Sequence, residues 1–410
     1  MGANAATIVL MTTTIRITDP VDLVKVVPYQ LGYHPERSLV LIGLRRKQIG
    51  LVQRLDLPTL PRDCEAAADL MAGHLRKDGC TGAVLVLYED TEGEGAVAAA
   101  ALVARLQVGR FDLVEHVVVR DGHVYFGALA GRADRPVSGV LLPPDDQVPA
   151  VADYVAHGRR PAPSRGSLDE RLAPEDDALS ERVRLAAARL GVLRPVLGSR
   201  PKAMADWGAF LDVGDDAWFV GTLPSAAATA RMCHSLRDLH LRDLVTAWLC
   251  PGTLELTAFD EDLRALAVEH LPAGRAWPEA YAAAGHSPAA GGVADDAPAA
   301  RPRGGAGSRR RRAASSKPRR VVTAVAGPRT DEDDRLVERL CWLARHTPEV
   351  HASAVLSVLA SVTWHLGDGT LTRVALDRAL ALDPSYRLAL LIERMVDLAI
   401  RPGRALSSTG

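Results

Sequence analysis

The sequence has few of the residues that usually mark a metal, redox or membrane protein. Its five cysteines are scattered without any CxxC pair, so neither a structural zinc site nor a disulfide framework is indicated. Aromatic residues make up only 4% of the chain, and no apolar run reaches the roughly 20 residues of a membrane-spanning helix. These absences favour a cytoplasmic protein with reduced thiols and no assigned metal or cofactor.

An excess of one charge is also missing. The formal net charge is −1, which argues against a surface that binds nucleic acid or membrane throughout. The stretch Ala5–Met11 is apolar but short, and it has neither a preceding basic residue nor a cleavage site, so it is a poor signal peptide. We expect the chain to start naturally at Met11, with residues 1–10 a start-codon artefact or a disordered tail.

Apolar residues are abundant, at 48% of the chain, and in the N-terminal part they alternate between strand and helix patterns. The predicted elements are helix 21–27, strands 38–44 and 49–57, helix 62–78, strand 83–88, helix 96–106, and strands 113–120 and 123–126. The dipeptide Asp121-Gly122 predicts a tight hairpin between the last two strands. This order predicts an α/β fold, a mixed sheet with flanking helices.

Composition divides the chain into four regions. We predict an α/β domain over residues 11–165 and a mainly helical region over 166–272 that packs on it. Residues 273–330 are rich in Ala, Pro, Gly, Ser and Arg and are predicted to be a disordered linker. Helical periodicity returns over 331–401, which predicts a small all-α module.

Three stretches resemble an actinobacterial family defined by a domain of unknown function. The first is Val27-Pro28-Tyr29-Gln30-Leu31-Gly32-Tyr33-His34-Pro35-Glu36, followed by Ser38-Leu39-Val40. The second is residues 54–58 (RLDLP), and the third is residues 155–168. Together with residues 364–387, they spread the resemblance over most of the predicted ordered chain. The resemblance implies no particular activity.

Residues 353–386 are similar to a single tetratricopeptide-type repeat. Gly367-Asp368 matches the turn between the two helices of such a repeat, and Asp383-Pro384 matches the end of the second helix. The resemblance implies a protein partner bound through residues 331–401, and the alternative is a plain helical packing unit. The candidate partner-binding residues are Trp364, Asp368, Arg373, Arg378 and Tyr386.

Polar residues also gather after predicted strands. Glu89 and Asp90 follow one strand, Asp56 ends another, and His34 with Glu36 precedes a third. Ligands of open α/β sheets bind at the carboxyl ends of strands, and carboxylates suit Mg²⁺ or Mn²⁺. This rim could therefore serve a metal-dependent enzyme acting on a phosphorylated or nucleotide-like molecule, with His34 carrying a proton. The alternative is a solvated acidic turn without a ligand.

A cluster of arginines lies in the predicted linker. The candidate polyanion-binding residues are Arg309, Arg310, Arg311, Arg312, Arg319 and Arg320. A flexible polycation can hold nucleic acid weakly through salt-sensitive contacts, although no aromatic residues are interleaved for base stacking. The alternative is a solubilising tether.

No catalytic motif accompanies these features, since the chain lacks a GxSxG elbow. A helical module joined by a long tether to a domain without a catalytic signature favours a non-enzymatic adaptor or regulatory protein. The metal-dependent enzyme and weak nucleic-acid association remain the alternative hypotheses.

Overall fold

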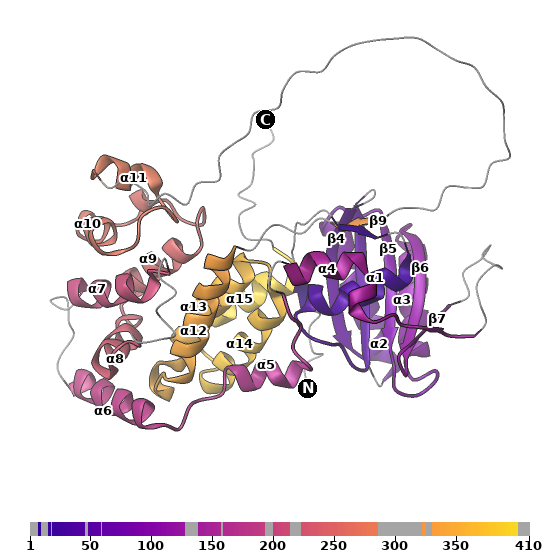
Figure 1. Cartoon of the computed structure of the whole chain (residues 1–410), viewed down its shortest axis with the longest axis horizontal. Helices are drawn as coiled ribbons and strands as arrows, with labels where there is room; N and C mark the ends of the chain where they lie inside the picture. Colours follow the sequence, from indigo (N-terminus) through magenta and orange to yellow (C-terminus); the bar gives the residue numbers. More distant parts are fainter. Residues whose placement is uncertain are drawn as a thin grey trace, which may run out of the picture.

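The structure is a computed structural model, and an α/β half and a helical half stand side by side in it (Figure 1). It describes residues 7–9, 15–17, 19–45, 48–58, 60–127, 138–156, 159–192, 200–213, 223–285, 322–324 and 330–400. Across these ranges, no helix combines the length and the apolar character that crossing a membrane requires.

The described strands form one mixed sheet in the order β2-β9-β4-β3-β5-β6-β7-β8, with β1 paired to β4. Their bounds are β1 Thr7–Val9, β2 Ile15–Ile17, β3 Ser38–Arg45, β4 Gln48–Asp56, β5 Gly82–Tyr88, β6 Asp112–Arg120, β7 His123–Phe126, β8 Val140–Leu141 and β9 Val322–Ala324. The predicted hairpin is present as the antiparallel pair β6–β7, and β3 and β4 form a second antiparallel pair. The α/β prediction of a mixed sheet is therefore confirmed.

Helices cover both faces of this sheet. The β3 side chains Val40 and Ile42 belong to the core shared with α1 (Pro20–Leu31) and α4 (Pro149–Ala156). Their neighbours Leu39 and Leu41 point to the opposite core, shared with α2 (Pro61–Lys77) and α3 (Ala96–Val108). Because successive side chains of a strand alternate, a strand buried on both faces is apolar throughout, as β3 is.

The first helix is longer than the sequence predicts. Helix α1 passes through Pro28 and ends at Gly32, which adopts a left-handed φ of 80°. A proline inside a helix leaves the carbonyl four residues earlier without its N–H partner. Here the Tyr88 hydroxyl donates to the carbonyl oxygen of Val24 at 3.5 Å, so the sheet supplies the missing partner.

From residue 159 on, the elements of the described ranges are helices, apart from β9. The helices are α5 Arg165–Arg171, α6 Ala178–Val192, α7 Arg200–Leu211, α8 Ala226–Ser235, α9 Leu239–Leu249, α10 Glu261–His270, α11 Pro278–Ala283, α12 Asp331–Arg345, α13 Glu349–His365, α14 Gly369–Leu382 and α15 Arg387–Asp397. Short 3-10 helices cover Asp145–Gln147 and Leu256–Ala258. Helices α8 and α9 are separate, because Asp238 caps the start of α9.

The C-terminal helices occupy a different place from the one expected. Helices α12–α15 lie between α6–α11 and the sheet (Figure 1), and α7, α8 and α9 contact α12 or α13. The region predicted to pack on the α/β domain is thus largely the outer layer of the helical half. The physical reason is a shared apolar core, which includes Trp207 of α7, Trp248 of α9 and Leu340 of α12.

The predicted linker over 273–330 is ordered at its start. Tyr281 of α11 is buried, and its hydroxyl donates to the carbonyl oxygen of Ala267 at 3.2 Å. Strand β9 also falls in this stretch and pairs with β2 and β4. Residues 286–321 lie outside the described residues, and so does the whole of the arginine cluster.

Candidate functional site

The strand ends that were predicted to form a ligand rim meet at one edge of the sheet. Ser38 at the start of β3 stands opposite both Asp56 of β4 and Tyr88 of β5. Tyr88 in turn stands opposite Val119 of β6. The register therefore brings Asp56 and the loop that begins at Glu89 to the same edge.

The Glu89 side chain stabilises the loop that follows it in the sequence. Its carboxylate is 6% exposed and accepts a hydrogen bond from Arg120 Nη1 at 2.6 Å. The same carboxylate accepts the backbone N–H groups of Gly93 and Gly95 at 3.2 and 3.4 Å. The oxygens of this buried carboxylate are therefore already used by donors of its own chain.

Two further carboxylates at this edge, Asp56 and Glu94, are paired with arginines. Asp56 forms an ion pair with Arg54, and Arg165 Nη1 lies 4.0 Å from its second oxygen. Glu94 accepts from Arg37 Nε at 2.6 Å, and this hydrogen bond holds the pKa of the Glu94 carboxyl below its usual range. Arginine side chains therefore bind these carboxylates, which leaves no open coordination site among them.

The remaining predicted rim residues add no metal ligand set. Asp90, His34 and Glu36 are exposed. Burial lowers the pKa of His34, and the carboxylate that acts on its imidazole is Asp145. Within the described part of the chain, no group of three or more His, Cys, Asp or Glu is placed to hold a metal ion.

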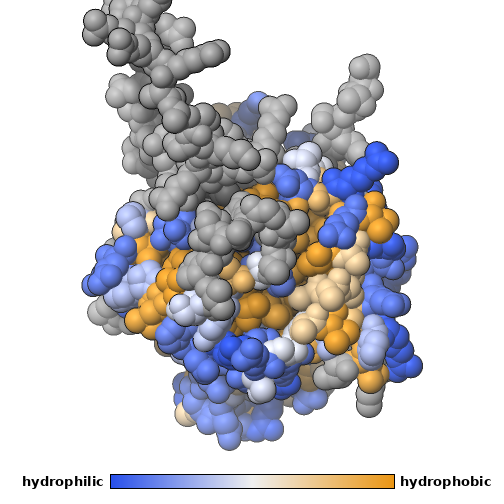
Figure 2. Space-filling view, turned by 90° about the vertical axis from the view of Figure 1, so that its right-hand side faces the viewer, coloured by the Kyte–Doolittle hydropathy of each residue, from blue (hydrophilic) through white to orange (hydrophobic). Residues whose placement is uncertain are grey.

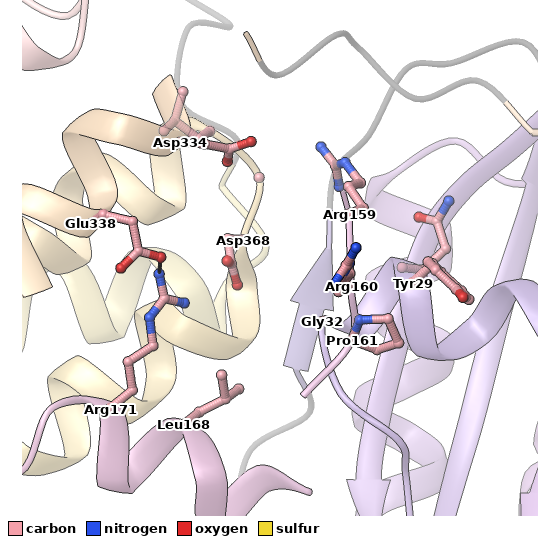
Figure 3. A pocket seen from close by; sticks show the side chains of 13 residues that line it. Tyr29, Gly32, Arg159, Arg160, Pro161, Leu168, Arg171, Asp334, Glu338 and Asp368 are labelled. Carbon is pink, nitrogen blue, oxygen red and sulfur yellow. Dashed lines mark hydrogen bonds and ion pairs between the residues drawn. The ribbon is translucent and has the colours of Figure 1, made fainter. Parts of the chain in front are cut away.

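A second polar site was not predicted, and it lies between the two halves. It is a cavity of about 240 Å³, formed by the end of α1, the segment that leads into α5, the helix α12 and the turn before α14 (Figure 3). Its lining residues are Tyr29, Gln30, Gly32, Arg159, Arg160, Pro161, Leu168, Arg171, Asp334, Glu338, Leu366, Gly367 and Asp368. We call it the interhalf cleft.

Short backbone contacts fix the walls of the interhalf cleft. The backbone N–H of Ala162 donates to Gly32 O at 2.8 Å, and that of His34 donates to Ala162 O at 3.0 Å. Ser164 caps α5, and Asp368 caps α14 by accepting the N–H of Leu371 at 2.9 Å. These contacts bring segments that are far apart in the sequence to one place.

Opposite charges face each other across the interhalf cleft. Arg159 and Arg160 lie on the α/β wall, and Asp334 and Asp368 lie on the helical wall (Figure 3). Arg171 of α5 forms an ion pair with Glu338 of α12. Burial lowers the pKa of Arg171, but Cys341, Glu338 and Asp368 together raise it by more, so its pKa lies above the ordinary value.

Tyr29 lines the interhalf cleft, and its phenol is hydrogen-bonded to the carboxylate of Asp145. The Tyr29 hydroxyl donates to Asp145 Oδ2 at 2.8 Å, and Lys25 pairs with the same carboxylate. Burial, followed by this hydrogen bond and the charge of Asp145, raises the pKa of Tyr29 to about 12. The phenol is thus a neutral donor at physiological pH.

The interhalf cleft is lined in part by residues of the stretches that carry the family resemblance. These are 27–36, 155–168 and the segment 364–387.

Two of the predicted partner-binding residues are interior residues. Trp364 is 2% exposed, and its Nε1–H donates to Ile400 O at 3.1 Å. Arg373 is 5% exposed and donates from Nη2 to Asp397 Oδ1 at 2.5 Å. Both side chains fasten the end of α15 to the neighbouring helices, so neither lines an open groove.

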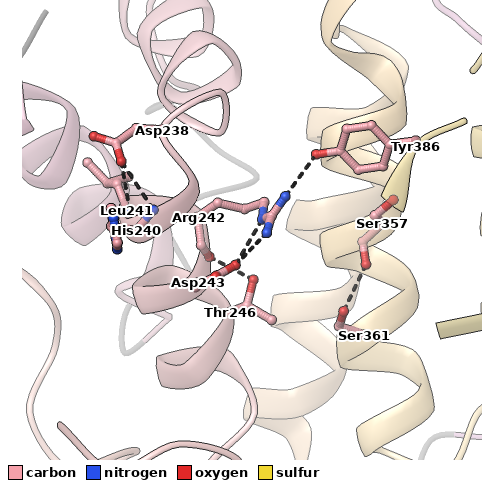
Figure 4. A network of polar contacts seen from close by, with 9 residues as sticks. All are labelled: Asp238, His240, Leu241, Arg242, Asp243, Thr246, Ser357, Ser361 and Tyr386. Carbon is pink, nitrogen blue, oxygen red and sulfur yellow. Dashed lines mark hydrogen bonds and ion pairs between the residues drawn. The ribbon is translucent and has the colours of Figure 1, made fainter. Parts of the chain in front are cut away.

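The other predicted partner residues are dispersed. Asp368 faces the interhalf cleft, and Arg378 is half-buried, with its pKa lowered by that burial. The Tyr386 hydroxyl accepts from Arg242 Nη1 at 3.5 Å, and Arg242 also donates to Asp243 (Figure 4). Tyr386 therefore holds the start of α15 against α9.

Helix α15 carries an apolar face that the sequence reasoning missed. Ala389, Ile392 and Val396 are its buried side chains. On the opposite side lie three leucines that are 42%, 57% and 38% exposed and two exposed arginines, in the order Arg387, Leu390, Leu391, Arg394 and Leu398. We call these five residues the α15 stripe. Their spacing of three and four residues, on the side opposite the buried one, was the available signal.

The protein is therefore an α/β domain joined to a helical bundle. Ion pairs occupy the strand ends of the α/β domain, and the α15 stripe exposes leucines and arginines on the bundle. The chain belongs to the family that shares the domain of unknown function DUF4192, because the family model matches residues 20–304 and 314–403. The comparisons with curated proteins and with solved structures found no match.

Proposed function

We propose that this protein is a non-enzymatic adaptor or regulatory protein of the cytoplasm that binds a protein partner through residues 331–401. The observation that carries the proposal is the α15 stripe, where Leu391 is 57% exposed on a helix whose other side is fully packed. A helix that is apolar on two sides is suited to two neighbours, and only one side has a neighbour within the described chain.

Charge selects the class of partner. Arg387 and Arg394 are exposed on the α15 stripe, and neither forms an ion pair with another described residue. Guanidinium groups beside leucines favour an amphipathic helix with an apolar face bordered by carboxylates. The partner segment is therefore expected to be acidic and helical.

The arrangement of α13 and α14 supports this role. The two helices pack on each other and are joined at Gly367-Asp368, where a tetratricopeptide-type repeat would place its turn. Such repeats commonly recognise proteins. Since Trp364 and Arg373 are buried, the proposed contact surface is the α15 stripe and not the inner faces of this pair.

The alternatives receive less support. A metal-dependent enzyme would need the carboxylates of Asp56 and Glu89, and arginines already pair with both. Nucleic-acid association would depend on the arginine cluster, which lies outside the described residues. The five free, buried cysteines suit a reducing compartment and therefore the cytoplasm.

A fluorescent peptide tests the proposal with the full chain. The probe is a designed amphipathic helix with leucines on one face and glutamates on its borders, and its control replaces each glutamate with lysine. We expect the acidic peptide to bind at least about tenfold more tightly than the control, since two guanidiniums select for it.

Two variants locate the binding site. Leu391→Asp should weaken binding of the acidic peptide about tenfold or more, because it places a carboxylate within the contact. The matched control is Val350→Asp on α13, an exposed valine outside the stripe, which should leave binding unchanged. Equal binding by the wild type and Leu391→Asp would overturn the assignment to α15.

A further inference from the structure

Helix α3 is a surface helix with an apolar outer side. Its inner residues, among them Leu102 and Leu106, are fully buried. On the outer side Val97 is 60% exposed and Val108 is 74% exposed, and small exposed alanines accompany them at positions 96, 100 and 104. A helix with apolar residues all round is normally enclosed, so this outer side is suited to another neighbour.

A groove runs beside this helix. It has a volume of about 610 Å³ and lies between α3 and the strands β6 and β7, with Val103 and Ala104 on one wall and Val118 and Tyr125 on the other. Figure 2 faces the side of the molecule where α3, β6 and β7 lie, and it shows apolar residues gathered between polar margins. The exposed valines of α3 and the groove therefore lie next to each other on one face of the molecule.

Apart from the exposed Glu92, the ionisable side chains that line the groove are neutral or paired. Burial lowers the pKa of His116, which keeps its imidazole neutral, and its Nε2 atom is buried with no partner among the described residues. Arg120 pairs with Glu89 and with Glu92, and its guanidinium stacks 4.6 Å from the centre of the Tyr125 ring. The occupant is therefore expected to be apolar where it enters the groove.

The two ends of α3 carry opposite charges. Glu92, just before the helix, has a side chain that is 85% exposed. At the other end stand Arg105, which pairs with Asp69, and Arg110, which is exposed. A second helix of the same kind, laid antiparallel, would bring its acidic end beside these arginines and its basic end beside Glu92.

We propose that the α3 face binds a second copy of this chain in an antiparallel, two-fold symmetric dimer. In a two-fold interface each copy offers the same patch, so that patch must complement itself. Here the valines of one α3 meet the groove of the other copy, the alanines at 96, 100 and 104 allow the helices to approach closely, and the end charges pair across the axis.

The mass of the full chain in solution is the first measurement. Light scattering after size exclusion should give twice the 43.8 kDa of one chain. Ala100→Arg should raise the dissociation constant by about a hundredfold, because it buries an unpaired charge at the centre of the contact. Ala100 is exposed in the single chain, so the variant should fold, and an unchanged melting profile by circular dichroism checks this.

A charge exchange tests the antiparallel geometry separately. Glu92→Arg alone and Arg110→Glu alone should each weaken the dimer about fivefold, and the double variant should restore it. The matched control is Val350→Arg, an exposed position on α13, which should leave the mass unchanged. A monomeric wild type, or a dimer that survives Ala100→Arg, would overturn the proposal. Failure of the double variant to recover would overturn the antiparallel arrangement.

Discussion

The two halves of the molecule differ in where their polar side chains lie and in what they bond to. In the α/β half the sheet core is mainly apolar, its buried polar side chains such as Gln53 are bonded to other elements, and charges at the strand ends are paired, as Glu89 is with Arg120. In the helical half polar side chains are buried within the helices, as Ser357 and Thr363 are, while α15 exposes leucines. The carboxylates Asp56 and Glu89, which resemble ligands in the sequence, are thus paired with arginines, whereas the exposed apolar side chains lie on a helix.

The reason for the difference lies in where the partners come from. Ser357 and Thr363 donate to carbonyl oxygens one turn earlier in their own helix, at 2.7 and 3.0 Å. Glu89 depends on Arg120, which lies on another strand. A helix satisfies such hydroxyl groups locally, whereas a strand end needs tertiary partners.

The largest expected effect comes from breaking the buried pair at the sheet end. Glu89→Ala should lower the free energy of unfolding by about 3 kcal/mol, since it leaves the Arg120 guanidinium without its buried partner. Chemical denaturation monitored by circular dichroism measures this. Glu65→Ala is the control, because Glu65 is exposed on α2, and it should change stability by less than about 0.5 kcal/mol. Similar losses from both variants would show that the buried pair of Glu89 and Arg120 stabilises the fold no more than an exposed carboxylate does.

Acid should destabilise the helical half next. Burial, and then the neighbouring His234, lowers the pKa of His351 to about 4, whereas an unfolded histidine titrates near 6.5. The unfolded state therefore binds more protons between these pH values, so stability falls as pH drops from about 6.5 to about 4. The loss is at most about 3 kcal/mol.

Denaturation curves recorded across this pH range, with His351→Gln as the comparison, measure the contribution of His351. The variant should show a shallower decrease, and the remaining slope belongs to other buried histidines such as His74, whose pKa burial also lowers. An equal slope in the wild type and the variant would contradict the assignment to His351.

Removing a locally satisfied hydroxyl should cost little. Ser357→Ala leaves the carbonyl of Ser353 within the hydrogen-bonding pattern of α13, so the free energy of unfolding should change by no more than about 0.5 kcal/mol. The same denaturation experiment measures it beside Glu89→Ala. A loss approaching that of Glu89→Ala would show that the two halves do not differ in this respect.

The smallest expected effect is that of divalent metal. Millimolar Mg²⁺ or Mn²⁺ should shift the melting temperature by less than about 1 °C, because Asp56 and Glu89 already hold guanidinium groups. Differential scanning fluorimetry measures the shift, with Asp56→Ala as the comparison. A larger shift that disappears in Asp56→Ala would restore the metal-dependent enzyme as the leading hypothesis.

Local patterns predicted the elements well where one pattern acted alone. Asp121-Gly122 predicted the β6–β7 hairpin, and the apolar run from Ser38 predicted β3. The end of α1 was placed too early, because the contact between Tyr88 and the Val24 carbonyl that offsets Pro28 comes from a distant strand. Strand β9 was missed for a similar reason, since its partners β2 and β4 lie far away in the chain.

The sites were predicted less well than the elements. The sequence placed Asp56 and Glu89 at strand ends, which is where they lie, but it could not show that Arg54 and Arg120 pair with them. The interhalf cleft needs α1, α5, α12 and the turn before α14 together, so no single stretch indicates it. The α15 stripe could have been found from its helical spacing alone.

By itself the sequence determined most of the secondary structure of the first half, its mixed α/β character and the family. Those properties depend on neighbours within a few residues, on apolar periodicity and on turn-forming residues. Only the tertiary structure decided which charges are paired, which residues of the last helix face outward and where the two halves meet. Pairing and exposure depend on residues such as His74 and Asp397, which lie 323 positions apart and are joined at 2.7 Å by the fold alone.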